Sequence, residues 1–497
     1  MTDTLRRPSV RHVPAVRRRA PRRTAARALP AVAALALVAS CTVGGGGTAK
    51  ADAGASGAGD PLFPQLGNGG YDVRHYGLTL AYEPDGNHLD GTAVITARAT
   101  QELVAFNLDL KGLDVRAVRV DGREARTERE GTELTVTPDR KIAKGRTFET
   151  VVTYGGTPEE ITDEDDEDDG DDGDAKDGEG AEGWVETDDG AVGLGQPTGS
   201  MAWFPGNHHP SDKAAYDIQV TVPAGYTAVA NGELKREETK GGRKSFSWHS
   251  AEPMASYLAS VAVSPFKVTT THAGKLPVYL ATHPKQAAAE PRLKKLVPEA
   301  LTWATGLFGP YPFSSAGAVV DHNPTLGYAL ETQTKPYFGT TPDDLTVVHE
   351  IAHQWFGNSV TPRTWRDMWL NEGFAQYAEW LWEEKRGGRS VQRIFDDYYD
   401  GKDPLSEGIW AYPPSDPEPE TVSDPPVYGR GAMVLHKLRR AVGDEKFFAT
   451  VRAWTAEHRH GNADTAEFVR FWERKSGKDL DGLFDVWLRG KGRPATR

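Results

Sequence analysis

The sequence predicts a multi-domain α+β protein with a β-rich N-terminal part followed by a mainly helical part. Two observations carry this expectation. Short segments with alternating apolar residues fill residues 71–273, whereas the composition shifts toward helix from residue 276 onward. Of the 497 residues, 38% are hydrophobic and thirteen are tryptophan. The chain can therefore bury the cores of about two to four domains.

The first forty residues have the pattern of an export signal. Residues 1–40 contain nine arginines and one acidic residue, and the apolar run at 29–39 is too short to span a bilayer. The run ends in Leu-Val-Ala-Ser-Cys41, which resembles a bacterial lipobox. The resemblance implies cleavage before Cys41, a lipid on its sulfur, and anchoring to the outer face of a bacterial cell membrane. Ordinary signal cleavage beside an unmodified cysteine is the alternative. Cys41 is the only cysteine, which excludes an intrachain disulfide.

Two further segments are predicted to stay outside the cores. Residues 41–70 are rich in Gly and Ala and indicate a flexible tether. Residues 159–189 hold eighteen acidic residues against one lysine, a formal charge of −17 that exceeds the net charge of −13 of the whole chain. This acidic insertion is predicted to be disordered. Calcium binding is the alternative, although the spacing of a calcium-binding loop is absent. No basic patch remains, so nucleic acid is not an expected partner.

Residues 71–273 predict a β domain that the acidic insertion interrupts. Apolar and polar residues alternate at 78–82, 93–95 and 106–110, and Asp-Gly pairs typical of turns separate such segments. This period of two is typical of strands that bury one face. The helical part is then expected to cover residues 274–497.

One short motif in the helical part carries metal-binding chemistry. His349 and His353 are four positions apart, so on a helix both imidazoles lie on one face and can bind the same tetrahedral Zn²⁺. Glu350 lies beside them, where it can act as a general base toward water. Thr341 is the predicted N-cap of this helix. The alternative is a buried helix whose histidines bind no metal.

A third ligand is available on a following amphipathic segment. Glu372 lies nineteen positions after His353, within an Asn-Glu-Gly sequence. With the first motif, this spacing resembles the gluzincin aminopeptidases, the family of aminopeptidase N and the leukotriene hydrolase. The resemblance implies one Zn²⁺ per chain bound by His349, His353 and Glu372. It also implies a saddle-shaped N-terminal β domain and a thermolysin-like catalytic domain.

The resemblance also implies a site for the substrate's amine. Residues 326–332 are similar to the Gly-x-Met-Glu-Asn motif of this family, with Glu331 at the glutamate. A carboxylate there binds the free α-ammonium group and places the first peptide carbonyl at the metal. Tyr328, Leu330 and Thr332 depart from the motif, which leaves the contacts to the substrate backbone open.

Three more residues receive roles from the same family pattern. Gln196 falls where the family has a substrate-contacting glutamine. Tyr428 falls where it has a tyrosine that can donate to the oxyanion of the attacked carbonyl. Glu379 lies two helical turns after Glu372, where it can support the metal ligands or form a surface salt bridge.

The predicted function is that of an exported, lipid-anchored zinc aminopeptidase, which hydrolyses the N-terminal bond of peptides through a metal-activated water. Two alternatives stay open. One is a zinc endopeptidase that uses the same metal site. The other is a catalytically silent surface-binding lipoprotein that has kept the fold. Peptide substrates, and the membrane reached through a lipid on Cys41, are the expected partners.

Overall fold

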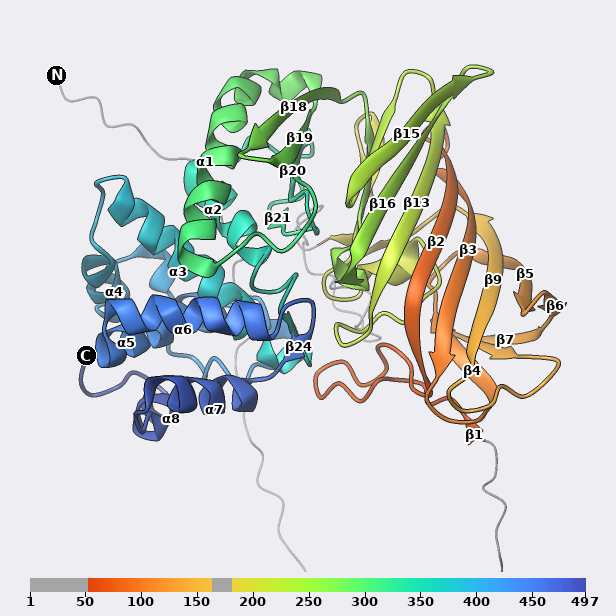
Figure 1. Cartoon of the computed structure of the whole chain (residues 1–497). Helices are drawn as coiled ribbons and strands as arrows, with labels where there is room; N and C mark the ends of the chain where they lie inside the picture. Colours follow the sequence, from red (N-terminus) through yellow and green to blue (C-terminus); the bar gives the residue numbers. More distant parts are fainter. Residues whose placement is uncertain (1–51, 163–180) are drawn as a thin grey trace, which may run out of the picture.

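The computed structural model of the chain describes residues 52–162 and 181–497. These residues form two domains that lie side by side, a β domain on the right of Figure 1 and a mainly helical domain on its left. The predicted order of a β-rich part and then a helical part is confirmed. The predicted export signal, Cys41 and the central acidic residues 163–180 lie outside the described residues.

An eight-stranded sheet forms the main layer of the β domain. Its strands, in spatial order, are β15 (Glu233–Lys240), β16 (Arg243–Ala255), β13 (Lys213–Pro223), β2 (Tyr71–Glu83), β3 (His88–Ala99), β9 (Thr147–Gly156), β5 (Asp114–Val120) and β6 (Arg123–Glu124). Strands β2 and β3 are antiparallel, with Leu78 opposite Ala93, and β13 runs parallel to β2. Leu78, Leu80 and Tyr82 are all buried, which confirms the predicted alternation.

Two smaller sheets complete the β domain. The first contains β1 (Asp52–Ala53), β4 (Leu103–Asp109), β8 (Glu133–Thr137) and β7 (Arg126–Glu130). The second contains β10 (Glu160–Ile161), β11 (Glu182–Thr187), β12 (Gly190–Leu194), β17 (Val261–Ser264) and β14 (Thr227–Ala230). The β domain also contains two 3-10 turns, η2 (Gly199–Ala202) and η3 (Ser256–Leu258), and the Tyr257 hydroxyl of η3 donates to the Gly357 carbonyl of the helical domain.

The tether predicted for residues 41–70 is wrong over its described part. Leu62 and Leu66 are buried in the core. The carboxylate of Asp60 accepts a hydrogen bond from the Trp365 backbone at 2.9 Å and lies 3.1 Å from the ring of His209. The Gly/Ala-rich composition did not indicate that long-range contacts would bury a few apolar side chains and one carboxylate of this segment.

The flanks of the acidic insertion are also ordered, contrary to the prediction for residues 159–189. Strand β10 pairs with β11 on either side of the undescribed residues. The buried carboxylate of Glu182 accepts hydrogen bonds from the backbone of Thr198 at 3.0 Å and Gly199 at 2.9 Å. Charge repulsion therefore does not prevent β10 and β11 from pairing at the two ends of the insertion. The buried carboxylate of Glu182 is tolerated there because backbone N–H groups donate to it.

The helical domain combines one mixed sheet with a layer of helices. The sheet contains β18 (Lys267–Ala273), β19 (Leu276–Thr282), β20 (Ala316–Val320), β22 (Tyr337–Phe338) and β21 (Ala329–Leu330). The helices are α1 (Glu290–Phe308), α2 (Asp344–His353), α3 (Trp369–Lys385), α4 (Val391–Tyr399), α5 (Gly431–Val442), α6 (Asp444–Glu457), α7 (Thr465–Ser476) and α8 (Asp481–Trp487). Shorter elements are η4 (Pro284–Ala289), η5 (Trp365–Asp367), η6 (Pro404–Ser406), η7 (Pro419–Thr421), the π-helical turn η8 (Pro426–Arg430), and the paired strands β23 (Thr361–Pro362) and β24 (Asn462–Ala463).

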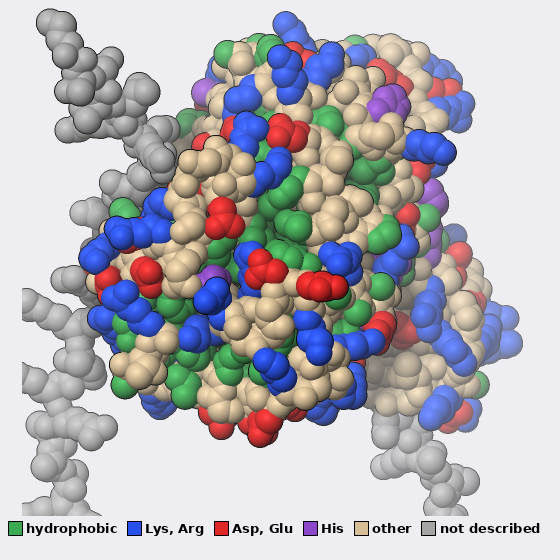
Figure 2. Space-filling view, turned by 60° about the vertical axis from the view of Figure 1, so that its left-hand side comes forward, with side chains coloured by type: hydrophobic (Ala, Val, Ile, Leu, Met, Phe, Trp, Pro, Cys, Tyr) green, Lys and Arg blue, Asp and Glu red, His purple; other side chains and the backbone are tan. Residues whose placement is uncertain are grey.

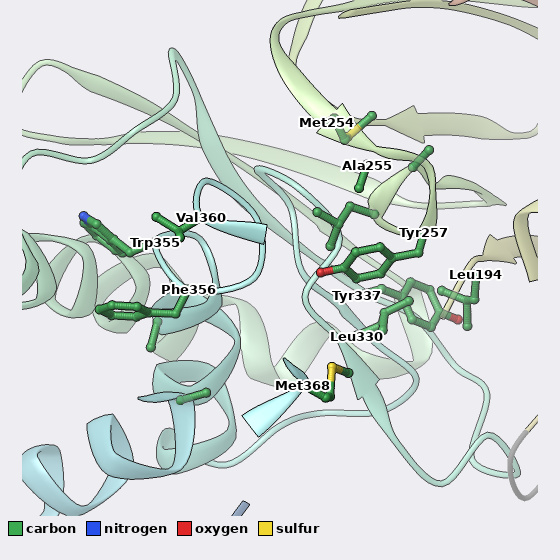
Figure 3. Packing of buried hydrophobic residues seen from close by; sticks show 14 of the residues in the cluster. Leu194, Met254, Ala255, Tyr257, Leu330, Tyr337, Trp355, Phe356, Val360 and Met368 are labelled. Atoms are coloured by element: carbon green, nitrogen blue, oxygen red, sulfur yellow. The ribbon is translucent and has the colours of Figure 1, made fainter. Parts of the chain in front are cut away.

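The border between the domains lies earlier than residue 273. Strand β18 forms a hairpin with β19, which pairs in parallel with β20 of the helical domain. A border at 273/274 would cut this hairpin, so the domains meet between β17 and β18. Figure 3 shows the apolar interior that they share, with Tyr257 of the β domain beside Leu330 and Tyr337 of the helical domain.

The face shown in Figure 2 carries acidic and basic side chains interspersed, with apolar side chains gathered in a hollow near its middle. Among the described residues, no helix has both the length and the apolar character needed to cross a membrane.

Candidate metal centre

Helix α2 presents both histidines of the motif on one face. It begins at Asp344, and its N-cap is Asp343, whose carboxylate accepts a hydrogen bond from the Thr346 backbone at 2.8 Å. The predicted N-cap, Thr341, lies before the helix and donates its hydroxyl to Gln286 at 2.7 Å instead. The prediction was wrong by two residues because aspartate at 343 is a strong cap closer to the first apolar turn.

Glu372 of α3 meets the two histidines of α2 at one point. Its Oε2 lies 3.2 Å from Nε2 of His349 and 3.3 Å from Nε2 of His353. Zinc bonds of 2.0–2.1 Å in a tetrahedron separate neighbouring ligand atoms by about 3.3–3.4 Å. The three side chains are buried, and their ligand atoms all lie within 4.8 Å of one another. The donor set and its spacing therefore fit a zinc ion.

Each imidazole is oriented through its other nitrogen. Nδ1 of His349 lies 2.6 Å from Oε1 of Glu379, and Nδ1 of His353 lies 3.0 Å from the carbonyl oxygen of Phe356. With Nδ1–H donating to these acceptors, the Nε2 lone pair of both rings is free for a metal. Of the two roles considered for Glu379, the structure therefore favours support of a ligand over a surface salt bridge.

The electrostatics of the cluster favour positive charge at the shared point. Burial by itself would raise the pKa of Glu372, but the two imidazoles outweigh it and lower this pKa to about 2. Burial would likewise lower the pKa of His349, yet the carboxylates of Glu372 and Glu379 raise it well above its usual value. A site with these pKa shifts attracts a cation.

Glu350 directs a carboxylate oxygen to the same region. Its Oε2 is buried and has no hydrogen-bond partner among the described residues. Burial raises the pKa of Glu350 to about 8. A carboxylate oxygen of Glu350 lies within 4.8 Å of a carboxylate oxygen of Glu331 and of a ring nitrogen of His353. This buried oxygen can therefore accept a proton from a molecule that enters the cluster.

Gln196 and Glu331 come together from different domains. With the amide of Gln196 oriented to donate, its nitrogen lies 3.0 Å from each carboxylate oxygen of Glu331. Gln196 follows β12 of the β domain, whereas Glu331 follows β21 of the helical domain. Glu331 is buried, and burial raises its pKa. The structure thus joins the two residues that the sequence analysis placed at the substrate.

Comparison with known proteins identifies the family. Residues 73–258 match the Peptidase M1 N-terminal domain, and residues 340–487 match the Peptidase family M1 domain. Together these matches cover more than half of the chain. The chain belongs to peptidase family M1.

Known relatives of this M1 peptidase include the Tricorn protease-interacting factor F2 of Thermoplasma volcanium, 26% identical over 325 residues that cover 61% of this chain and 41% of the relative. The glutamyl aminopeptidase of Bos taurus is 27% identical over 325 residues, which cover 60% of this chain and 34% of the relative. The matched region thus spans well under half of these relatives' own length.

Solved structures of the family match over most of the chain. The M1 zinc metallopeptidase from Deinococcus radiodurans is 29% identical with a TM-score of 0.78, covering 88% of this chain and 98% of that one. A variant of the same metallopeptidase bound to a Tyr-Ser-Ala substrate is 28% identical with a TM-score of 0.79, covering 88% of this chain and 99% of that one. The two-domain M1 architecture is therefore confirmed. His349, His353 and Glu372 are the zinc ligands of this M1 peptidase.

Tyr428 lies beside the ligands of the M1 peptidase, on the turn η8. Its ring stacks on that of His349 with 6.0 Å between centroids and an interplanar angle of 18°. Burial and the carboxylates of Glu372, Glu331 and Glu350 hold the pKa of this phenol well above its usual value. The phenol therefore keeps its proton and can act as a hydrogen-bond donor.

Sequence reasoning missed two residues that hold Glu331 in this M1 peptidase. Nε2 of Gln354 donates to the Glu331 carbonyl oxygen at 3.1 Å, and Nδ2 of Asn358 donates to the same oxygen at 2.7 Å. Gln354 follows the second histidine directly, Asn358 lies five positions after it, and both are buried. Two amides in an otherwise apolar segment were the available signal, because buried amides need partners.

Proposed function

We propose that the chain is a zinc-dependent aminopeptidase that hydrolyses the N-terminal bond of peptides. The observation that carries the proposal is the closeness of Glu331 to the metal cluster, since oxygens of Glu331 and Glu350 and a nitrogen of His353 lie within 4.8 Å of one another. A carboxylate at this distance can bind an α-ammonium group only when the adjoining peptide bond lies at the metal. The names of the glutamyl aminopeptidase and of the Tyr-Ser-Ala complex support this substrate class.

Different residues of the chain have different roles in the reaction. Zinc, when bound by its three ligands, supplies Lewis-acid activation of a water molecule and of the peptide carbonyl. Glu331 and Gln196 hold the amine end of the peptide in place. Glu350 accepts the proton of the attacking water and returns it to the leaving amine. Tyr428 donates a hydrogen bond to the carbonyl oxygen as negative charge develops on it.

A panel of aminoacyl chromogenic substrates, assayed with and without a chelator, tests this activity. Hydrolysis that the chelator abolishes and that added zinc restores is the expected result. Each substrate is also assayed after acetylation of its amine. Acetylated substrates that are hydrolysed equally well would favour the endopeptidase alternative. Stoichiometric zinc with no hydrolysis of any substrate would favour the silent surface-binding alternative.

We further propose that Cys41 carries a lipid and anchors the protein to the outer face of a bacterial membrane. The support is the arginine-rich segment, the apolar run and the Leu-Val-Ala-Ser-Cys sequence. Labelled palmitate fed to an expressing bacterium should enter the protein and fail to enter a Cys41→Ser variant. Equal release of both proteins into the medium would contradict the anchor.

A further inference from the structure

We propose that the β domain positions Glu331 for amine binding, through Asn231 and through Thr334 in the turn after Glu331. This inference rests on the proposed aminopeptidase function, in which Glu331 binds the substrate's amine. Asn231 and Thr334 are both positioning residues, because they act on the carboxylate of Glu331 through the backbone that carries it.

The backbone turns sharply just after Glu331. The Lys335 backbone donates to the Thr332 carbonyl at 3.2 Å, and the Thr332 hydroxyl donates back to the Lys335 carbonyl at 2.5 Å. Within this turn Thr334 has a φ of 70°. A β-branched residue rarely adopts this left-handed conformation, so contacts around the turn must hold it there.

The β domain supplies several of these contacts. Nδ2 of Asn231, just after β14, donates to the Gln333 carbonyl at 2.9 Å. The Gly232 backbone donates to the Thr334 hydroxyl at 2.8 Å. The Gln333 backbone donates to the Leu258 carbonyl, at the end of η3, at 3.1 Å. Residues of the β domain thus bond to both residues at the tip of the turn.

Asn231 is itself held rigidly. Its side-chain nitrogen also donates to the Leu258 carbonyl at 2.9 Å, and its oxygen accepts from the Ser260 backbone at 2.8 Å. Its exposed fraction is 1%. An asparagine with both donors and its acceptor engaged in the interior has one orientation, so it fixes the Gln333 carbonyl relative to η3.

Lys335 connects the end of the turn to the β domain as well. Its ammonium group donates to the Gly232 carbonyl and lies 4.6 Å from the ring centre of Trp248 on β16. The side chain is buried against this ring, and burial lowers the pKa of Lys335 to about 7. The turn is therefore fixed at its tip and at its end by the β domain.

The other side of the turn is bonded to the zinc helix. Oε1 of Gln354, the residue after His353, accepts from the Thr334 backbone at 2.8 Å, while its Nε2 donates to the Glu331 carbonyl at 3.1 Å. The turn therefore lies between the β domain and the end of α2. Loss of the β-domain contacts frees the turn to relax away from its strained conformation. The zinc ligands stay in place, since the side-chain hydrogen bonds of Asn231 go to Leu258, Gln333 and Ser260.

The test compares two inhibitors that differ only in the amine. L-Leucine carries the α-ammonium group, and its hydroxy-acid analogue, 2-hydroxy-4-methylpentanoate, carries a hydroxyl in its place. Asn231→Ala removes the amide, and Thr334→Val removes the hydroxyl at constant shape. Thr334→Ser is the matched control that keeps the hydroxyl, and Glu331→Ala gives the effect of losing the carboxylate itself.

We expect Asn231→Ala and Thr334→Val to raise the inhibition constant of L-leucine about tenfold, as the loss of one well-placed hydrogen bond does. The constant of the hydroxy acid should change less than about twofold, with one zinc retained per chain, because the metal end of the site is intact. Thr334→Ser should behave as the parent protein.

Zinc-loaded Thr334→Val with unchanged constants for both inhibitors would overturn the inference, and so would an equal rise for both. If Asn231→Ala fails to fold, the two inhibition constants of Thr334→Val test the inference by themselves. A parent protein that does not prefer L-leucine, with no effect of Glu331→Ala, would instead overturn amine binding by Glu331 and this inference with it. A normal effect of Glu331→Ala with none from the positioning variants overturns the inference alone.

Discussion

Nδ1 of His349 lies 2.6 Å from Oε1 of Glu379, so a carboxylate of α3 orients an imidazole of α2. Glu379 and the zinc ligand Glu372 are seven residues apart on one face of α3. One helix therefore supplies both a ligand and the acceptor that fixes a second ligand. Such an acceptor sets the tautomer and raises the basicity of the ring that binds the metal.

Glu379→Gln should weaken zinc binding about 10–100-fold, because a neutral amide accepts the Nδ1 proton less strongly than a carboxylate. Competition with a chromogenic chelator measures the affinity. Glu384→Gln, at an exposed position of the same helix, is the control and should bind zinc as the parent does. Equal affinities for both variants would show that the contact with His349 contributes nothing to the metal.

Glu350→Gln should bind one zinc per chain yet lose hydrolysis by several orders of magnitude. The amide keeps the shape of the side chain but cannot accept a proton from water. Metal content checks that zinc is retained, and initial rates on an aminoacyl substrate check that hydrolysis is lost. Rates close to those of the parent, with zinc bound, would remove Glu350 from the role of general base.

Tyr428→Phe should lower kcat by about 10²–10³, with a smaller change in KM, because its hydrogen bond strengthens only as charge develops on the carbonyl oxygen. The comparison is Tyr412→Phe, whose hydroxyl donates to the Thr421 carbonyl at 2.6 Å. That control should lose some stability and keep its kcat. A rise in KM alone for Tyr428→Phe would indicate ground-state binding instead.

Glu133 should make the β domain less stable as pH rises. It lies opposite Asp109 in the β4–β8 pair, and neither of its carboxylate oxygens has a hydrogen-bond partner among the described residues. Burial and the charge of Asp109 raise the pKa of Glu133 from 4.5 to about 7. A raised folded-state pKa gives stability that is present below the unfolded value and is lost as pH rises through the folded value.

Glu133→Gln should therefore unfold at a higher temperature than the parent at about pH 8 and at nearly the same temperature at about pH 4. The gain in free energy of unfolding should be about 1–3 kcal/mol, which corresponds to a few degrees in Tm. Glu128→Gln, on the exposed strand β7, should show no such pH dependence. A shift that is the same at both pH values would rule out a titration of Glu133.

The sequence predicted elements that local periodicity defines. The alternation in β2 and the helical spacing of α1 and α3 depend on neighbours within a few residues, so their faces could be read directly. Caps and borders were less certain, as the correction from Thr341 to Asp343 and the β18–β19 hairpin show. There, short polar segments permit more than one local structure, and tertiary packing decides between them.

By itself the sequence determined the zinc site, since i,i+4 geometry brings two imidazoles together and places Glu350 beside them. The tertiary structure alone decided which residues surround that site. Gln196 reaches Glu331 from another domain, and Asn231 bonds to the turn carrying Glu331 from a position one hundred residues earlier in the chain. The physical reason is that helical geometry is fixed by adjacent residues. Contacts between domains depend instead on how separately folded layers pack, which no local pattern records.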